Sequence, residues 1–113
     1  MATGTIINVT KANSGAITST KGTLESWSVV RRSGNTVMLT FRITLNQNIS
    51  AFNEIAVVPS GFRPSESLNL NMPCQVGSSI VNNQVQILNT GVIRTASALT
   101  SGQGFGFTVT YII

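Results

Sequence analysis

The sequence predicts an all-β fold: an antiparallel β-sandwich, jelly-roll-like, with about eight or nine short strands. Apolar and polar residues alternate with a period of two along much of the chain, and no long stretch shows apolar residues at helical spacing. Clusters of Gly, Pro, Asn and Ser interrupt this alternation at short intervals and supply the turns. Since 113 residues is the usual length of one domain, we predict a single domain over residues 1–113, with residues 1–22 as a short N-terminal extension or strand.

The first half of the chain contains the clearest strand, residues 36–45. Its predicted buried face consists of Val37, Leu39, Phe41, Ile43 and Leu45. The preceding run, residues 23–32, also alternates, and the short loop at residues 33–35 contains Gly and Asn, which predicts a β-hairpin. Residues 51–58 predict another strand that ends at Pro59, and residues 59–65 are dense in turn formers and predict a connection.

The second half of the chain predicts four or five further strands. Residues 67–76 form one, interrupted by Pro73, which belongs at a sheet edge or a bulge because it lacks a backbone N–H. Residues 79–81 and 84–88 flank a predicted two-residue turn at Asn82 and Asn83, and a second turn at residues 89–91 precedes a strand over residues 92–96. The last strand, residues 104–113, has one apolar face that consists of Phe105, Phe107, Val109, Tyr111 and Ile113.

The composition argues against an enzyme. The chain has no His and no Asp, and its only acids are Glu25, Glu54 and Glu66, which the sequence does not bring together. General acid–base, glycosidase and hydrolytic metal chemistry depend on His and paired carboxylates, so we expect no catalysis, no metal and no cofactor. Ser, Thr, Asn and Gln occupy 43 of the 113 positions. These neutral polar side chains suit binding to sugars or to neighbouring chains.

The charge pattern favours neither nucleic acid nor a membrane as a partner. The net charge of +4 comes from scattered Lys and Arg residues, and the adjacent Arg31 and Arg32 should point to opposite faces of a strand. No apolar run approaches the length of a membrane span, and the N-terminus shows no secretory signal. Cys74 cannot form an intrachain disulfide because it is the single cysteine, and we expect it to be a buried or half-buried core residue.

The order of several segments is similar to that of a known family. A strand bearing the only tryptophan comes first, and the segments are WSVVRR at 27–32, SGNTVMLTFRIT at 33–44, IAVVPSGFRPS at 55–65, VQILNTGVI at 85–93 and YII at the end. Over residues 23–113 this order resembles the C-terminal head or tip domains of bacteriophage tail fibres and baseplate receptor-binding proteins, particularly of phages that infect Gram-positive bacteria. Its most specific element is the GN-T-V hairpin followed by the P-x-G-F-R-P-S connection.

The resemblance implies a homotrimeric β-sandwich in the virion, at the tail tip or baseplate, that contacts other tail proteins and adsorbs to a bacterial surface saccharide without cleaving it. Ligand residues do not transfer, because binding loops differ within the family. Head domains usually follow a long trimeric shaft, whereas this chain begins at Met1 with little sequence before the first strand, so an excised domain and a small stand-alone virion protein are both considered. The alternative function is a structural virion component, a baseplate or capsid decoration protein with no receptor of its own.

The candidate ligand-binding residues are Trp27, Phe62, Arg63, Asn69, Asn71, Asn82 and Asn83. An indole can stack on a sugar ring, but a position in the middle of a strand favours the core or a subunit interface for Trp27. Phe62 and Arg63 lie in a connection, where binding residues are common, although the segment also reads as a structural turn. The asparagines, with Gln75, could line a polar groove or be solvated turn residues. Gly104 and Gly106 are expected to allow close approach of another strand or subunit.

Overall fold

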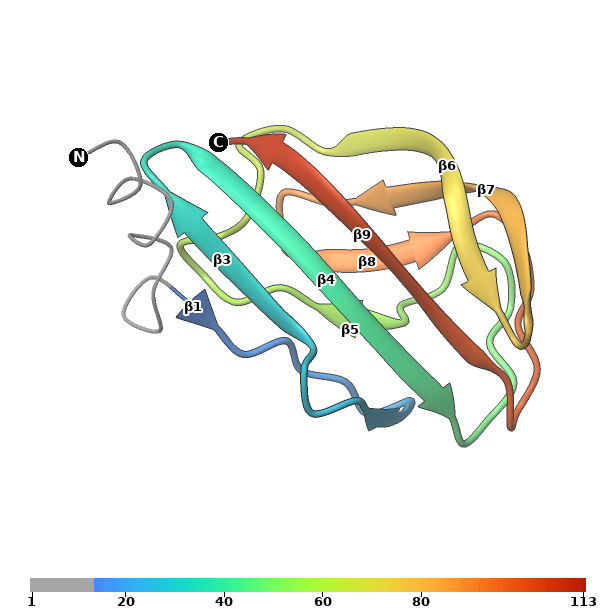
Figure 1. Cartoon of the computed structure of the whole chain (residues 1–113). Coiled ribbons are helices and arrows are strands. Elements are labelled where there is room, and N and C mark those ends of the chain that lie inside the picture. The colour runs from blue at the N-terminus through green and yellow to red at the C-terminus, as the bar shows by residue number, and fades with distance from the viewer. Residues whose placement is uncertain (1–13) are drawn as a thin grey trace.

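The computed structural model describes residues 14–113, and in this part of the chain it contains nine β-strands and no helix (Figure 1). Every strand pairing is antiparallel, which confirms the predicted all-β antiparallel fold. The prediction for the N-terminal extension falls partly on residues outside this range. The strands are β1 Ser14–Gly15, β2 Gly22–Leu24, β3 Val29–Ser33, β4 Thr36–Leu45, β5 Ala56–Val57, β6 Leu68–Val76, β7 Ser79–Ile87, β8 Val92–Thr95 and β9 Gly104–Ile112.

All nine strands belong to one hydrogen-bonded sheet that curls into a half-barrel. Its order is β1-β3-β4-β9-β6-β7-β8-β5, and β2 also pairs with β4. The curl brings the two ends of the sheet together, since the N–H of Thr18 donates to the carbonyl of Val57 (3.1 Å) and the N–H of Val57 donates to the carbonyl of Thr18 (2.8 Å). The finer prediction of a jelly-roll-like sandwich is not confirmed, because the strands are joined in a single continuous ladder.

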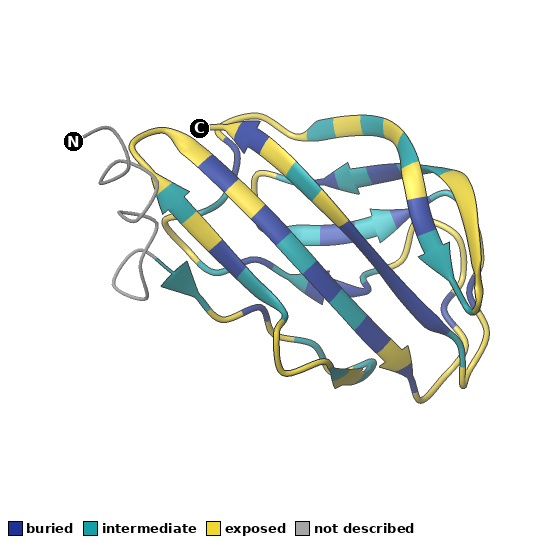
Figure 2. Ribbon diagram, in the orientation of Figure 1, coloured by how far each residue is buried: buried dark blue, intermediate teal, exposed yellow. Residues whose placement is uncertain are grey.

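Strands β4 and β9 form the centre of the sheet and carry much of the core. They pair along nearly their whole length, from Thr36 opposite Ile112 to Thr44 opposite Gly104. Figure 2 shows the alternation of buried and exposed positions along β4, as the sequence predicts. Phe41, Phe105 and Phe107 meet edge to face inside the curl, with ring centroids 4.9–6.2 Å apart. Such edge-to-face pairs are favourable because the positive ring edge meets the negative ring face.

The predicted strand over residues 23–32 is instead two strands with a turn between them. β2 ends at Leu24 and β3 begins at Val29, and both pair with β4. The N–H of Ser28 donates to the carbonyl of Glu25 (2.9 Å), which closes the turn, and the Ser28 hydroxyl accepts from the N–H of Arg42 (3.1 Å). The Ser28 hydroxyl thus takes the place of a ladder partner for the backbone N–H of Arg42 on β4. The chain can therefore leave the sheet between β2 and β3.

Two further boundaries differ from the predictions. Strands β6 and β7 join through a two-residue turn at Gly77 and Ser78, where Gly77 has a φ of 61°, and not at Asn82 and Asn83, which lie within β7. Glycine adopts positive φ without steric cost, so it specifies this hairpin turn better than the asparagine pair does. The strand predicted over residues 51–58 is reduced to β5, Ala56–Val57.

Two other predictions for this part of the chain are confirmed. Beyond Gln75 and Val76, β6 has no ladder partner on the β9 side, so Pro73 occupies an edge-like stretch. Arg31 lies opposite the exposed Met38 and Arg32 opposite the buried Val37, as expected for neighbours on a strand.

Cys74 and Tyr111 are buried, and their environments make the fold sensitive to alkaline pH. Removal from water raises the pKa of the Cys74 thiol from 9.0 to about 11 and that of the Tyr111 hydroxyl from 10.0 to about 12. The Tyr111 hydroxyl donates to the carbonyl of Phe62 (2.6 Å), a bond that its deprotonation would remove.

We therefore expect the free energy of unfolding to fall as the pH rises above 9.0. Between pH 9.0 and about 11 the unfolded thiol releases its proton while the folded thiol keeps it, so the unfolded state binds fewer protons and gains stability. Tyr111 adds the same trend between pH 10.0 and about 12. Urea unfolding across this range measures the effect. In a Cys74→Val variant the decline should begin a full pH unit later, and an unchanged profile in that variant would contradict the assignment.

Candidate functional site

Among the described residues, Trp27 is the largest exposed hydrophobic side chain. It sits in the turn between β2 and β3 and 53% of its surface is accessible to solvent. The expectation that it lies in the middle of a strand is therefore wrong, because the Glu25–Ser28 turn lifts it out of the ladder. A large aromatic ring held outside the core of a small protein is available for contact with another molecule.

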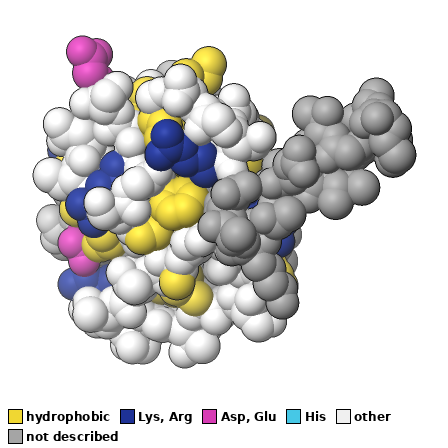
Figure 3. Space-filling model, turned by 90° about the vertical axis from the view of Figure 1, so that its left-hand side faces the viewer, with side chains coloured by type: hydrophobic (Ala, Val, Ile, Leu, Met, Phe, Trp, Pro, Cys, Tyr) yellow, Lys and Arg dark blue, Asp and Glu magenta, His cyan; other side chains and the backbone are white. Residues whose placement is uncertain are grey.

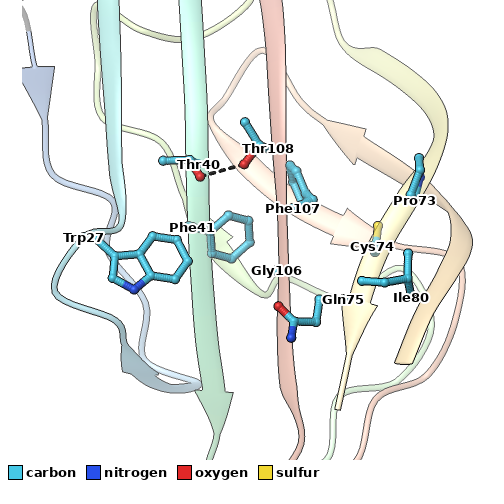
Figure 4. Close-up of a pocket in the computed structure, with 10 residues that line it drawn as sticks. All are labelled: Trp27, Thr40, Phe41, Pro73, Cys74, Gln75, Ile80, Gly106, Phe107 and Thr108. Atoms are coloured by element: carbon cyan, nitrogen blue, oxygen red, sulfur yellow. Dashed lines mark hydrogen bonds between the residues drawn. The ribbon is translucent and has the colours of Figure 1, made fainter. Parts of the chain in front are cut away.

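Trp27 borders a surface pocket of about 200 Å³ at the point where β6 diverges from β9 (Figure 4). The pocket combines the turn with residues of β4, β9 and the β6–β7 hairpin. Its lining residues are Trp27, Thr40, Phe41, Pro73, Cys74, Gln75, Ile80, Gly106, Phe107 and Thr108. Because β6 pairs with β9 only through Gln75 and Val76, the sheet leaves this hollow between them.

The polar groups of the pocket are hydroxyls and an amide. Thr40 and Thr108 are directly opposite each other on β4 and β9, and their hydroxyl oxygens lie 2.7 Å apart. Gln75 extends from β6 toward Gly106, which has no side chain to obstruct it (Figure 4). The lining contains no charged side chain, and its single titratable group, the thiol of Cys74, has a raised pKa. The pocket therefore offers an aromatic face, hydroxyls and an amide to an uncharged, hydroxyl-rich ligand.

The structure places Phe62 and Arg63 away from this pocket and in structural contacts. The carbonyl of Phe62 accepts the Tyr111 hydroxyl, and the Nε of Arg63 donates to the carbonyl of Val58 (2.8 Å). Both side chains are half-buried, and Phe62 packs against the core. These contacts hold the connection between β5 and β6 in place, as in the structural-turn interpretation.

The four asparagines do not gather around Trp27. Asn69 and Asn71 are exposed on β6, and the Oδ1 of Asn69 accepts from the Nε2 of Gln84 (2.6 Å). Asn82 is exposed opposite Pro73, and Asn83 accepts from the hydroxyl of Ser97 (2.6 Å). Asn69, Asn71 and Asn82 share one face of the β6–β7 hairpin and Asn83 lies on the other, and none of the four lines the Trp27 pocket.

Sequence reasoning missed two threonines and one aromatic residue. Thr40 and Thr108 lie on the predicted outer faces of their strands, but nothing in the alternation shows that they are paired. Phe52 is 43% exposed and has a φ of 60°, which is rare for a residue with a large side chain, and the Arg94 guanidinium carbon lies 6.0 Å from its ring centroid. Phe52 does not line the Trp27 pocket.

The fold and the pocket define a small antiparallel β-protein with an uncharged surface site beside the exposed ring of Trp27. Comparison with known proteins finds no family model that matches the chain and no significant match among curated proteins. In residues 14–113, no helix is long and apolar enough to cross a membrane, and no three His, Cys, Asp or Glu side chains cluster as metal ligands would.

Proposed function

We propose that the protein is a non-enzymatic receptor-binding domain of a bacteriophage tail tip, which attaches the virion to a bacterial surface saccharide. The observation that carries this proposal is the exposed ring of Trp27 beside the hydroxyls of Thr40 and Thr108 and the amide of Gln75. The order of segments that resembles phage head domains supports the virion as the location, with other tail proteins as neighbours. The neutral polar surface, low in acids, agrees with the same role.

The chemistry of the pocket matches that of a sugar ring. One face of a pyranose consists of C–H groups, which pack on an indole, while the ring edge carries hydroxyls that exchange hydrogen bonds with threonine hydroxyls and amides. A pocket of about 200 Å³ that is open to solvent holds one such unit weakly. We propose a homotrimer, since repeating a weak site within a trimer and across several fibres produces strong attachment without new contacts.

Replacement of Trp27 tests the function directly. We expect Trp27→Ala to weaken binding to a panel of Gram-positive cells and purified cell-wall polysaccharides by about tenfold or more, corresponding to a loss of at least about 1.4 kcal/mol. The matched control is Phe52→Ala, which removes another exposed ring that lies outside the pocket and should retain binding. Circular dichroism and unfolding curves establish that both variants fold. A wild-type protein that is monomeric and binds neither cells nor polysaccharide would contradict the proposal.

A structural role in the virion is the second candidate. It is favoured by apolar side chains outside the core, of which Ile80 is 68% and Ile112 is 74% exposed, because such residues are often covered by neighbouring subunits. Adsorption competition separates the two functions. A receptor-binding domain added in excess blocks infection, whereas a decoration protein binds particles and leaves adsorption unchanged.

A further inference from the structure

Two more hollows lie near the Trp27 pocket and are linked to it through shared lining residues. A second hollow of about 400 Å³ is lined by Trp27 and Arg31 together with residues of β1, β3 and the turn, and a third of about 210 Å³ is lined by Arg31, Met38 and Thr110 with others. Trp27 borders the first and second hollows, and Arg31 borders the second and third. The three hollows therefore adjoin one another along the outer face of β3, β4 and β9.

Arg31 differs from the other arginines because its guanidinium donates no hydrogen bond within the described residues. In the described part of the chain, Arg31 has no hydrogen-bond or ion-pair partner for its side chain, and it is exposed. The other four arginines donate to protein oxygens: Arg32 to Gly34 and Gly61, Arg42 to Gly77, Arg63 to Val58, and Arg94 to Gln86. A guanidinium with five free N–H donors is a ready partner for a carboxylate or a phosphate.

The charges around the hollows agree with an anionic partner. None of the residues that line the three hollows is acidic, so the charge of Arg31 is not neutralised within them. On the face shown in Figure 3, Lys, Arg, acidic and hydrophobic side chains are interspersed among neutral ones. The net charge of +4 adds a weak attraction for anions over the whole surface.

We propose that these hollows form one groove, which binds an extended saccharide chain of several units and recognises an anionic group on it, a carboxylate or a phosphate, at Arg31. A sugar unit stacks on Trp27, and the chain continues toward β3 so that the anionic substituent meets the guanidinium. This inference rests on the proposed saccharide-binding function and specifies its ligand. A single neutral sugar would fill only the first hollow and would leave Arg31 without a role.

The test uses the wild-type protein with immobilised oligosaccharides as probes. Galacturonic acid disaccharide and hexasaccharide are compared with their methyl esters, and phosphorylated mannose oligomers with unphosphorylated ones, so that the two arms separate carboxylate from phosphate recognition. We expect an acidic hexasaccharide of one arm to bind about tenfold tighter than its neutral counterpart and than the disaccharide. Arg31→Gln should reduce this preference to about one. Lys21→Gln, which removes the same charge outside the groove, should retain it.

The outcomes distinguish this inference from the function on which it rests. If Trp27→Ala loses binding while Arg31→Gln keeps the wild-type preference for the acidic oligosaccharide, recognition of the anionic group by Arg31 is wrong and saccharide binding stands. Equal affinity for disaccharide and hexasaccharide overturns the extended groove. If the wild-type protein binds neither these probes nor any bacterial polysaccharide, the proposed function fails together with the inference.

Discussion

Replacing Phe41 with alanine should lower the free energy of unfolding by about 3–5 kcal/mol, the largest stability loss that we expect from a single core substitution. Phe41 is almost completely buried on the central strand β4, and its ring contacts two other phenylalanine rings edge to face, those of Phe105 at 6.2 Å and Phe107 at 4.9 Å between centroids. Removal of the ring loses the free energy that the protein gains by transferring it from water into the core. It also leaves a cavity that strands β4 and β9 cannot close, because their hydrogen-bonded ladder is continuous at this point.

Denaturant unfolding of both proteins measures this loss, with comparison of the slopes to confirm that the two-state treatment holds. Phe52→Ala is the matched control, since it removes the same ring from a position that is 43% exposed and lies outside the three-ring cluster. Its cost should stay within about 1 kcal/mol. Equal losses in the two variants would show that the three-ring cluster does not hold the sheet together.

Gly106→Ala should cost about 2–3 kcal/mol, a large effect for the addition of one methyl group. A Cβ at this position of β9 would overlap the backbone carbonyl oxygen of Phe41 and lie 3.0 Å from the Cα of Arg42. Backbone atoms in the middle of a paired strand cannot move aside without distorting the ladder. The predicted close approach at Gly106 is therefore that of β4, the neighbouring strand of the same chain.

Gly104→Ala provides the comparison, because the atoms nearest to its Cβ would be those of the Arg42 guanidinium, the far end of a flexible side chain. Arg42 can swing away, so the loss should be no more than about 1 kcal/mol. Thermal and denaturant unfolding of the two variants measure the difference. A Gly104→Ala variant as unstable as Gly106→Ala would mean that the backbone approach at Gly106 is not the cause.

The strands with clear period-two alternation were predictable. Residues 36–45 match β4 at both ends, and the apolar residues predicted on one face of that strand are all buried. The last strand was also predicted to within one residue, with Phe105, Phe107 and Tyr111 in the core. In both segments local residue order alone decides which side chains face the core, because successive strand residues point to opposite sides.

The interruptions of the strands were not predictable in the same way. The alternation continues through residues 23–32, yet the chain turns at Glu25–Ser28, because the Ser28 hydroxyl can satisfy the backbone of Arg42 in place of a ladder bond. That compensation depends on a residue 14 positions away in the sequence. The pair Asn82 and Asn83 predicts a turn because asparagine tolerates left-handed φ, but Gly77 adopts positive φ without steric cost and the turn forms there.

By itself the sequence determined an all-β chain and the inward faces of its longest strands, since these follow from the local alternation of apolar and polar residues. Only the tertiary structure decided that Trp27 is exposed, that Thr40 meets Thr108 across 68 positions of sequence, and that β6 parts from β9 to leave a pocket. Strand order and sheet curl arise from long-range pairing, and the period of two carries no information on which strands become neighbours.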